Sequence, residues 1–482
     1  MIEIDGRNLA LADIVAVADG SPVSLAPAAL ARMEASQESA VATASRRPVY
    51  GRSTGVGANR TVALTEAGGA DTHGLKLLRS HAVDAGESLD RRTVRAMMVV
   101  RLSQLAAGGS GISPVIAEAL AGMINADVVP EVREFGGIGT ADLPALAGTA
   151  LTMLGERLPL GGGNAPFVLE TWPTSDALPF ISSSALTIAQ AVLAHQRLAG
   201  LLTNAMAVAS LSFIAMSGNP EALSPAVAAA ADSPAITTAA NTLRALVEGS
   251  GPSARIQDPY CLRTLPQIFG SQAEELDALG ALLERLVVAA NENPLVHGSP
   301  AEGSNDVAHH GLFQMTSLAK RIDTLNLAIG AACATHLRRI DLLCDPAYTG
   351  LHPFLAEDGS GQSGVMMLEY VAAAAVGRIR ANAQPASLQT VVLSLGAEED
   401  ASFASLAAAQ LESTADALAT VTAVELVCAV RALRLQGKVP EDFPSATLRN
   451  VLSAGFDLPE DVGDRDLRDD VEQALRLVRE RL

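Results

Sequence analysis

Long runs rich in alanine and leucine constrain the fold of this chain more than any other feature. Apolar residues recur at intervals of three and four over six segments of at least about five helical turns: 185–216, 224–248, 271–290, 312–343, 364–383 and 397–436. Hydrophobic residues make up 49% of the chain but aromatic residues only 3%, so the core must consist of small and aliphatic side chains packed between helices, and strands are poorly supplied. The sequence therefore predicts an all-α fold with a central bundle of long antiparallel helices.

Glycine and proline breaks divide the chain into three predicted parts. Residues 1–200 form an N-terminal helical domain, 201–436 the central long-helix bundle, and 437–482 a helical tail. Shorter helices are predicted in the first part, over 75–105 and 110–126. In the tail, the segment 464–482 predicts an amphipathic helix with one apolar face, formed by Leu467, Val471, Leu475 and Val478.

The balance of charge favours a small-molecule partner. The chain has 34 Lys and Arg against 53 Asp and Glu, a net charge of −19, which opposes binding to nucleic acid or to an anionic membrane. The segment 198–220 has no charged residue and approaches the length of a membrane span. Polar residues such as Asn204 and Ser210 interrupt it, so we interpret it as a buried helix of the bundle.

Cysteine and histidine positions do not predict a metal site or a disulfide. The four cysteines are far apart without a C-x-x-C spacing: Cys261, Cys333, Cys344 and Cys428. His309 and His310 are adjacent, so their side chains point to different sides, and no third ligand is near in sequence. These positions lead us to expect a protein without a metal. Because the N-terminus lacks a basic segment followed by an apolar run, we also expect a cytoplasmic protein.

Two of only four tyrosines lie in polar, turn-rich motifs. Tyr50 begins a loop with three glycines in seven positions, and Tyr260 precedes Arg263 by three residues. That spacing lets the Arg263 guanidinium present a two-donor fork to a carboxylate while the phenol faces the same cavity. An ion pair of Arg263 with an acidic neighbour such as Asp258 is the alternative. Arg338 and Arg339 are adjacent, and we expect them to form ion pairs at the surface or at an interface.

A glycine-rich stretch at 136–147, GGIGTADLPALA, precedes an apolar helix. It resembles G-S-V-G-A-S-G-D-L-A-P-L-A of the histidine and phenylalanine ammonia-lyase family, in which Ala-Ser-Gly cyclises into an electrophilic methylidene-imidazolone ring. Here Thr140 and Ala141 stand in place of the three residues, and Asp142 follows in register. Because the Ser hydroxyl and the Gly amide are both missing, the resemblance implies a protein without this cofactor.

Other motifs of that family are retained from about Tyr50 to residue 436. YGRSTGVG at 50–57 is similar to Y-G-x-N-T-G-F-G, which implies that Tyr50 is the catalytic base. LLRSHA at 77–82 resembles L-V-L-S-H-A of the histidine branch, which places His81 beside the substrate ring. QDPYCLR at 257–263 resembles Q-D-P-Y-S-L-R, so Tyr260 would assist at the reacting centre and Arg263 would hold the carboxylate.

The remaining motifs bear on the specificity for the substrate ring and show where else the chain departs from the family. GAEED at 396–400 resembles G-Q-E-D-H, which aligns Glu398 with the active-site glutamate of the histidine branch. The family's L-N-G-T-Q becomes ISSSA at 181–185, so Ser182 replaces an asparagine near the electrophile. Its G-N-F-H-G becomes GLFQM at 311–315, which puts Gln314 there. The changes surround the lost ring while the base and the anchor are kept, a pattern that random decay would not produce.

The resemblance implies a long-helix fold of the histidine ammonia-lyase and fumarase/aspartase type, assembled as a homotetramer with shared active sites. Tyr50, Tyr260 and Glu398 would meet only where subunits join. A trimethylammonium group forms no adduct but leaves as a neutral amine, so we expect a ring-independent, ergothionase-like lyase acting on a histidine-derived betaine. The alternatives are another cofactor-free elimination, cyclisation or ammonia-lyase reaction, or a non-catalytic family member. Tyr50 would need its pKa lowered from about 10 by positive charge or hydrogen-bond donors.

Overall fold

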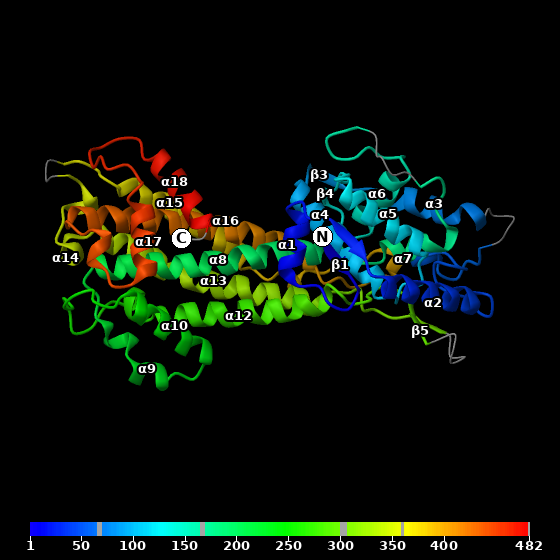
Figure 1. Cartoon of the computed structure of the whole chain (residues 1–482), viewed down its shortest axis with the longest axis horizontal. Helices are drawn as coiled ribbons and strands as arrows, with labels where there is room; N and C mark the ends of the chain where they lie inside the picture. Colours follow the sequence, from blue (N-terminus) through cyan, green and yellow to red (C-terminus); the bar gives the residue numbers. More distant parts are fainter. Residues whose placement is uncertain (65–69, 164–168, 299–305, 358–360, 481–482) are drawn as a thin grey trace. The chain divides into compact units, whose positions relative to one another are not determined.

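The computed structural model describes residues 1–64, 70–163, 169–298, 306–357 and 361–480. These residues are mostly helical (Figure 1), which confirms the all-α prediction. The strands are three residues long, or four in one case, and form three two-stranded sheets within this part of the chain. One sheet is parallel, β1 (Ile2–Ile4) with β2 (Val23–Leu25); two are antiparallel, β3 (Ala85–Ser88) with β4 (Arg133–Phe135) and β5 (Leu295–His297) with β6 (Asp306–Ala308).

The chain forms two compact units that are not continuous in sequence. Unit one comprises residues 1–194, 279–322 and 385–409, and unit two comprises 195–278, 323–384 and 410–482. Four of the five divisions fall inside the four longest helices, α8 (Ala185–Ala215), α12 (Leu265–Leu286), α13 (Thr316–Leu343) and α16 (Ala404–Leu435). This arrangement differs from the predicted parts 1–200, 201–436 and 437–482, because each of these helices belongs partly to both units.

Unit one is built around α4 (Arg91–Ala106), which is buried from Thr93 to Ala106 and packs against α1 and α5. A single helix over 75–105 was expected, but β3 interrupts it and the Asp90 carboxylate caps α4 by accepting from Thr93 N at 3.0 Å. The other helices of this unit are α1 (Leu11–Ala18), α2 (Pro27–Ala44), η1 (Gly57–Asn59), α3 (Ala70–His81), α5 (Pro114–Asn125), α6 (Leu143–Met153), η3 (Thr174–Asp176), α7 (Ala177–Ile181), η7 (Ala386–Leu388) and η8 (Ser394–Gly396).

Unit two contains segments of the four long helices together with several shorter helices. The predicted helix 224–248 is divided in two, because Ser233 and Pro234 start a new helix after a break. In the tail, Asp470, Ala474 and Val478 form the buried stripe, so the predicted apolar face is shifted. The shorter helices are η4 (Pro220–Leu223), α9 (Pro225–Ala229), α10 (Pro234–Leu246), α11 (Tyr260–Arg263), α14 (Pro346–Thr349), η6 (Pro353–Leu355), α15 (Met366–Asn382), η9 (Pro440–Asp442), α17 (Ala446–Gly455) and α18 (Arg468–Arg479).

Side-chain contacts tie α8, α12, α13 and α16 into a bundle within unit two. His195 on α8 bonds the carbonyl of Leu276 on α12, and Phe269 on α12 meets His336 on α13 edge to face at 6.4 Å. Three contacts fix the direction of α8 against α16: Arg197 with Asp416, Ser212 with Glu425, and the carbonyl of Ala215 with Gln436. Because the residue numbers increase in the same direction along both helices, α8 and α16 are parallel. The expectation of antiparallel helices is wrong for this pair.

One span among the described residues, Thr174–Ala215, is long and apolar enough to cross a membrane by length and composition alone. In the structure, 78% of its most apolar window is buried inside the protein. The hydroxyls of Thr203 and Ser210 donate to carbonyls four residues earlier, which satisfies polar groups in an apolar helix. These observations support the interpretation of this segment as a helix of the bundle.

Candidate functional site

The Tyr50 loop, residues 50–59, is anchored at its start by a small core and a buried arginine. Val49 is fully buried beside residues of α2, β5 and β6. The Arg52 guanidinium donates to the carbonyls of Ser110 and Gly111 at 3.0 and 2.7 Å. The backbone N–H of Tyr50 donates to His309 Nε2 at 3.2 Å. Tyr50 therefore lies on an irregular loop that these contacts hold in place.

The Tyr50 loop contacts the Glu398 turn, residues 393–398, within one chain. The phenol oxygen of Tyr50 accepts from Gly57 N at 2.8 Å, and Ser394 Oγ accepts from Ala58 N at 3.0 Å. A Cβ atom at Gly57 would lie 3.5 Å from Glu398 Oε1. The expectation that Tyr50 and Glu398 meet only between subunits is therefore wrong, because long-range folding of one chain already brings them together.

The surroundings of Tyr50 do not favour its phenolate form. Burial raises its pKa above the usual 10, and the nearby Glu398 carboxylate raises it further. The Gly57 N–H and the Arg60 guanidinium lower it, but by less. This direction is opposite to the one that a base requires, so additional positive charge is needed for Tyr50 to accept a proton.

The glycine-rich segment at 136–142 is clamped by residues at the start of α16. The carbonyls of Gly137 and Gly139 accept from the hydroxyls of Ser405 and Ser402, each at 2.7 Å. A Cβ at Gly139, where φ is +83°, would come within 2.2 Å of Ser402 Oγ. Glycine is therefore required at 139 by both conformation and space.

Thr140 and Gln314 are brought together, as the positions of their motifs suggested. Their backbones pair as an isolated antiparallel bridge. The Gln314 amide nitrogen donates to Asp400 Oδ2 at 2.7 Å, and its oxygen accepts from Thr316 N at 3.0 Å. The segment 394–405 thus contacts both the Tyr50 loop and the glycine-rich segment, which joins them in one site.

Asp142 connects the glycine-rich segment to the start of α8. Its carboxylate accepts from Thr187 N and Thr187 Oγ1, both at 2.9 Å, and its N–H donates to Ser183 O at 2.7 Å. Burial raises its pKa to about 6 in spite of these bonds. Ala141, just before it, has a φ of +85°. Thr140 and Ala141 do not fit the three-residue ring precursor, and the amide that follows them is already bonded.

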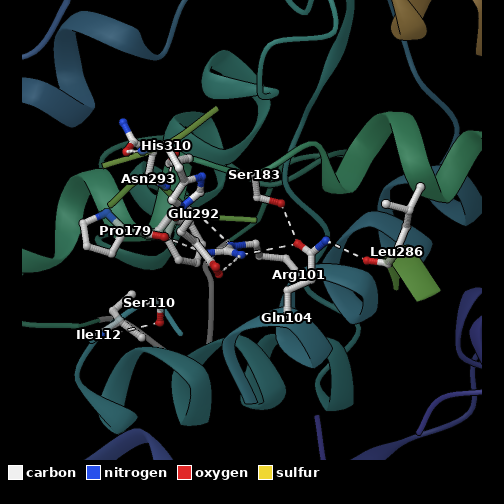
Figure 2. A network of polar contacts seen from close by, with 12 residues as sticks. Arg101, Gln104, Ser110, Ile112, Pro179, Ser183, Leu286, Glu292, Asn293 and His310 are labelled. Carbon is white, nitrogen blue, oxygen red and sulfur yellow. Dashed lines mark hydrogen bonds and ion pairs between the residues drawn. The ribbon is translucent and has the colours of Figure 1, made fainter. Parts of the chain in front are cut away.

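Ser182 belongs to a serine turn, 182–184, and a buried polar network holds this turn through Ser183 and Asn293 (Figure 2). Its hydroxyl oxygen accepts from Asn293 N at 3.2 Å, and Ser183 Oγ donates to Gln104 Oε1 at 2.6 Å. At the centre of the network, Arg101 pairs with Glu292 at 2.7 Å, and each side chain is 1% exposed. The motifs did not identify this pair, although an arginine within the apolar run 96–102 of α4 is a visible sequence signal.

His81 is the last residue of α3, which packs against α6. Its Nδ1 is 2.9 Å from the Leu77 carbonyl and 3.0 Å from Ser80 Oγ. A bond to a carbonyl requires a proton on Nδ1, and in the neutral imidazole Nε2 is then an acceptor. Within the described part of the chain, the structure shows no contact of His81 with the other predicted site residues.

Tyr260 and Arg263 belong to unit two, on the short helix α11. The Arg263 guanidinium stacks over the Tyr260 ring, 4.4 Å from its centroid, and Tyr260 is 68% exposed. Asp258 is instead paired with Arg255 at 2.8 Å, so the alternative pairing of Arg263 with Asp258 is wrong. Among the described residues Arg263 makes no ion pair, which leaves its fork available for an external carboxylate.

The buried ion pair of Arg339 with Glu425 contacts α11 through the Cys261 carbonyl. Arg339 donates to both oxygens of Glu425, at 2.6 and 2.9 Å, and to the Cys261 carbonyl at 3.4 Å. Burial would raise the pKa of Glu425, but Arg339 and His336 outweigh it and lower that pKa to about 2. The prediction of a surface or interface role is wrong for Arg339, which is fully buried, and fits Arg338, which pairs with Asp341 in solvent.

No group of three His, Cys, Asp or Glu side chains that could hold a metal occurs among the residues that the structure describes. His309 and His310 bind different partners, the Tyr50 amide and the Glu292 carbonyl. All four cysteines are buried and free.

Comparisons with known proteins place the chain in a family. A model of the aromatic amino acid lyases matches residues 9–454. Histidine ammonia-lyase from Streptomyces coelicolor is 32% identical, with 99% of this chain and 96% of the relative covered. Ergothionase from Treponema denticola superimposes with a TM-score of 0.89 at 22% identity, covering 99% and 98% of the chains. Histidine ammonia-lyase from Trypanosoma cruzi gives 0.87 at 25% identity, covering 99% and 93%.

The long-helix fold and the retained motifs define a helical carbon–nitrogen lyase. More specifically, the chain belongs to the aromatic amino acid lyase family.

Proposed function

We propose that this protein is a methylidene-imidazolone-independent lyase that eliminates trimethylamine from a histidine-derived betaine such as ergothioneine. The observation that carries the proposal is the shortened segment Thr140-Ala141 in a chain that retains Tyr50, Glu398 and Arg263. A permanently charged trimethylammonium group leaves as a neutral amine, so its departure needs no electrophilic ring. The structural likeness to an ergothionase, an ergothioneine-degrading enzyme, supports the choice of ergothioneine as a substrate to test.

In the proposed reaction, Tyr50 accepts the β-proton of the substrate. The electrons of that C–H bond form the Cα–Cβ double bond, and the Cα–N bond breaks with its electron pair leaving on trimethylamine. Ergothioneine would give thiourocanate. General-base catalysis of this kind contributes roughly 10² to 10⁴ in rate. Arg263 would bind the carboxylate through its free two-donor fork, and Tyr260 would assist at the reacting centre.

The ring of the substrate would lie between His81 and Glu398. Glu398 is exposed in the single chain, and the bond of His81 Nδ1 to Leu77 presents Nε2 as an acceptor. Ser182 and Gln314 would shape the wall where relatives carry the ring. Both are held by protein partners, Asn293 and Asp400.

We also propose a homotetramer in which the site is completed by α11 of other subunits, within a reducing cytoplasm. Apolar side chains beside Glu398 are unusually exposed, with Val392 at 68% and Leu395 at 98%. Ile256, near Tyr260, is 94% exposed. Such apolar surfaces favour burial against another chain.

The test is incubation with histidine, hercynine and ergothioneine, with detection of the amine and of a conjugated acrylate chromophore. Release of trimethylamine from a betaine, with no product from histidine, is the expected result. The second candidate function is an ammonia-lyase reaction, which the relatives named histidine ammonia-lyase favour. Ammonia released from histidine would establish that candidate and refute the first.

Intact mass tests the absence of the ring separately. The measured mass should equal the sequence mass, and borohydride should not inactivate the enzyme. A deficit of two waters in the peptide that contains Thr140 to Asp142 would refute ring independence.

A further inference from the structure

We propose that Ser394 is a positioning residue that holds the Tyr50 loop on the Glu398 turn, so that base and ring-side carboxylate reach the substrate as one unit. The inference rests on the proposed function of Tyr50 and Glu398. Three features of the structure support it: consecutive amide contacts, a close approach at Gly57, and positive φ angles in the turn.

Two consecutive amides bind the two hydroxyl groups. Gly57 N donates to the phenol oxygen of Tyr50 at 2.8 Å, and the next amide, Ala58 N, donates to Ser394 Oγ at 3.0 Å. These amides begin η1, where no helical carbonyl is available to them. The same short backbone segment therefore supports the phenol and is itself supported by Ser394.

The contact leaves no room for a side chain between loop and turn. Gly57 has a φ of +56°, and a Cβ there would lie 2.8 Å from Ser394 Oγ and 3.5 Å from Glu398 Oε1. Gly57 thus allows the loop backbone to approach both residues of the turn at once. The backbone segment that bonds the Tyr50 phenol therefore lies directly against the turn that carries Glu398.

The turn adopts a backbone conformation that non-glycine residues rarely adopt. Ser394 and Leu395 have φ angles of +52° and +56°, and hydrogen bonds between Leu393 and Glu398 close the turn at 2.8 and 3.3 Å. Burial of Leu395 does not stabilise it in the single chain, because that side chain is 98% exposed. Strain of this kind is typical of functional sites, and here the turn presents Ser394 to Ala58.

The variant Ser394→Gly separates positioning from folding. Glycine accepts a φ of +52° without strain, so stability should be kept or increased, whereas the acceptor for Ala58 N is lost. Peptides covering residues 50–64 should exchange amide hydrogens faster. With the substrate that the wild type turns over, kcat should fall about five- to tenfold, the factor expected for one net hydrogen bond, with KM nearly unchanged.

Ser217→Gly is the matched control, because Ser217 is an exposed serine of unit two with a φ of +51°. It should change neither the exchange of 50–64 nor kcat. Unchanged exchange in Ser394→Gly would refute the proposal, as would a loss of thermal stability with faster exchange throughout the chain. Since exchange needs no substrate, this test still decides the role of Ser394 if every compound of the panel fails and the proposed function is wrong.

Discussion

Tyr50 is held in surroundings that raise its pKa, which constrains how it can act as a base. Burial and the Glu398 carboxylate both favour the neutral phenol. A substrate with a permanent trimethylammonium charge would oppose these effects, because a nearby cation stabilises the phenolate. We infer that a cationic substrate favours the phenolate form of Tyr50 and so helps to activate the base. A substrate amine that can lose its charge would have this effect less reliably.

Tyr50→Phe should lower kcat by at least about 10² with little effect on substrate affinity, since it removes an interaction made mainly in the transition state. Steady-state kinetics and equilibrium binding on the same substrate will measure both. Full turnover by this variant would show that another residue is the base.

Asp142 should make stability depend on pH in a defined direction. Its pKa is about 6 in the folded state against 3.8 as the ordinary value, so the folded protein binds the proton more tightly than the unfolded chain. Stability is therefore greatest below about pH 4 for this group and decreases as the pH rises through 6, by roughly 1–3 kcal/mol.

Asp142→Asn cannot ionise and should abolish this part of the pH dependence. Urea unfolding of both proteins at pH 4 and pH 7 gives the comparison, in which groups shared by the two proteins cancel. Parallel stability curves over this interval would contradict a raised pKa for Asp142.

At the scale of the elements, buried charges determine how the apolar helices pack. The ion pair of Arg339 on α13 with Glu425 on α16 lies inside unit two, and Ser212 on α8 donates to the same carboxylate at 2.8 Å. Hydrophobic packing alone permits many registers between alanine-rich helices. A charge pair that must be satisfied in a dry interior permits few.

Glu425→Ala should therefore destabilise the protein by about 3–5 kcal/mol, because it leaves the Arg339 charge buried without a partner. Asp341→Ala, which breaks the exposed pair with Arg338 on the same helix, should cost less than about 1 kcal/mol. Urea midpoints at pH 7 measure both. The contribution of Glu425 is complete above about pH 4.5 and is lost as the pH falls toward 2, so equal effects of the two variants at pH 7 would contradict this account.

At the scale of the whole molecule, the predicted site residues are divided between the two units. Tyr50, Glu398, Ser182 and Gln314 lie in unit one, whereas α11 carries Tyr260 and Arg263 in unit two. A site assembled from several subunits would unite them, in agreement with the proposed tetramer.

Complementation can detect shared sites. Tyr50→Phe and Arg263→Lys should each be nearly inactive, the second because a point ammonium replaces a planar fork and weakens binding by roughly 1.5–3 kcal/mol. Co-expressed, they should recover part of the activity, since some sites then contain both native residues. Light scattering should give about four times the chain mass of 49.6 kDa; a monomer, or no recovery in mixed tetramers, would contradict shared sites.

The helical class, most of the long helices and the motifs that carry Tyr50, Tyr260 and Glu398 can be predicted from the sequence alone. Those features depend on local periodicity and on motifs of a few residues. Segment 224–248 was misjudged because a Ser-Pro start inside it outweighs the apolar pattern. Segment 75–105 was misjudged because β3 pairs with a strand that begins 45 residues after it.

Which distant groups meet depends on how the whole chain folds. The tertiary structure placed Ala58 against Ser394, Asp142 at the start of α8, and Arg339 on Glu425, pairs separated by 336, 45 and 86 residues. Their bonds form because buried polar groups must be satisfied, and the available partner depends on how the whole chain packs. A local sequence pattern contains no information on that choice, which is why Arg339 was expected at the surface or at an interface and is found in the core.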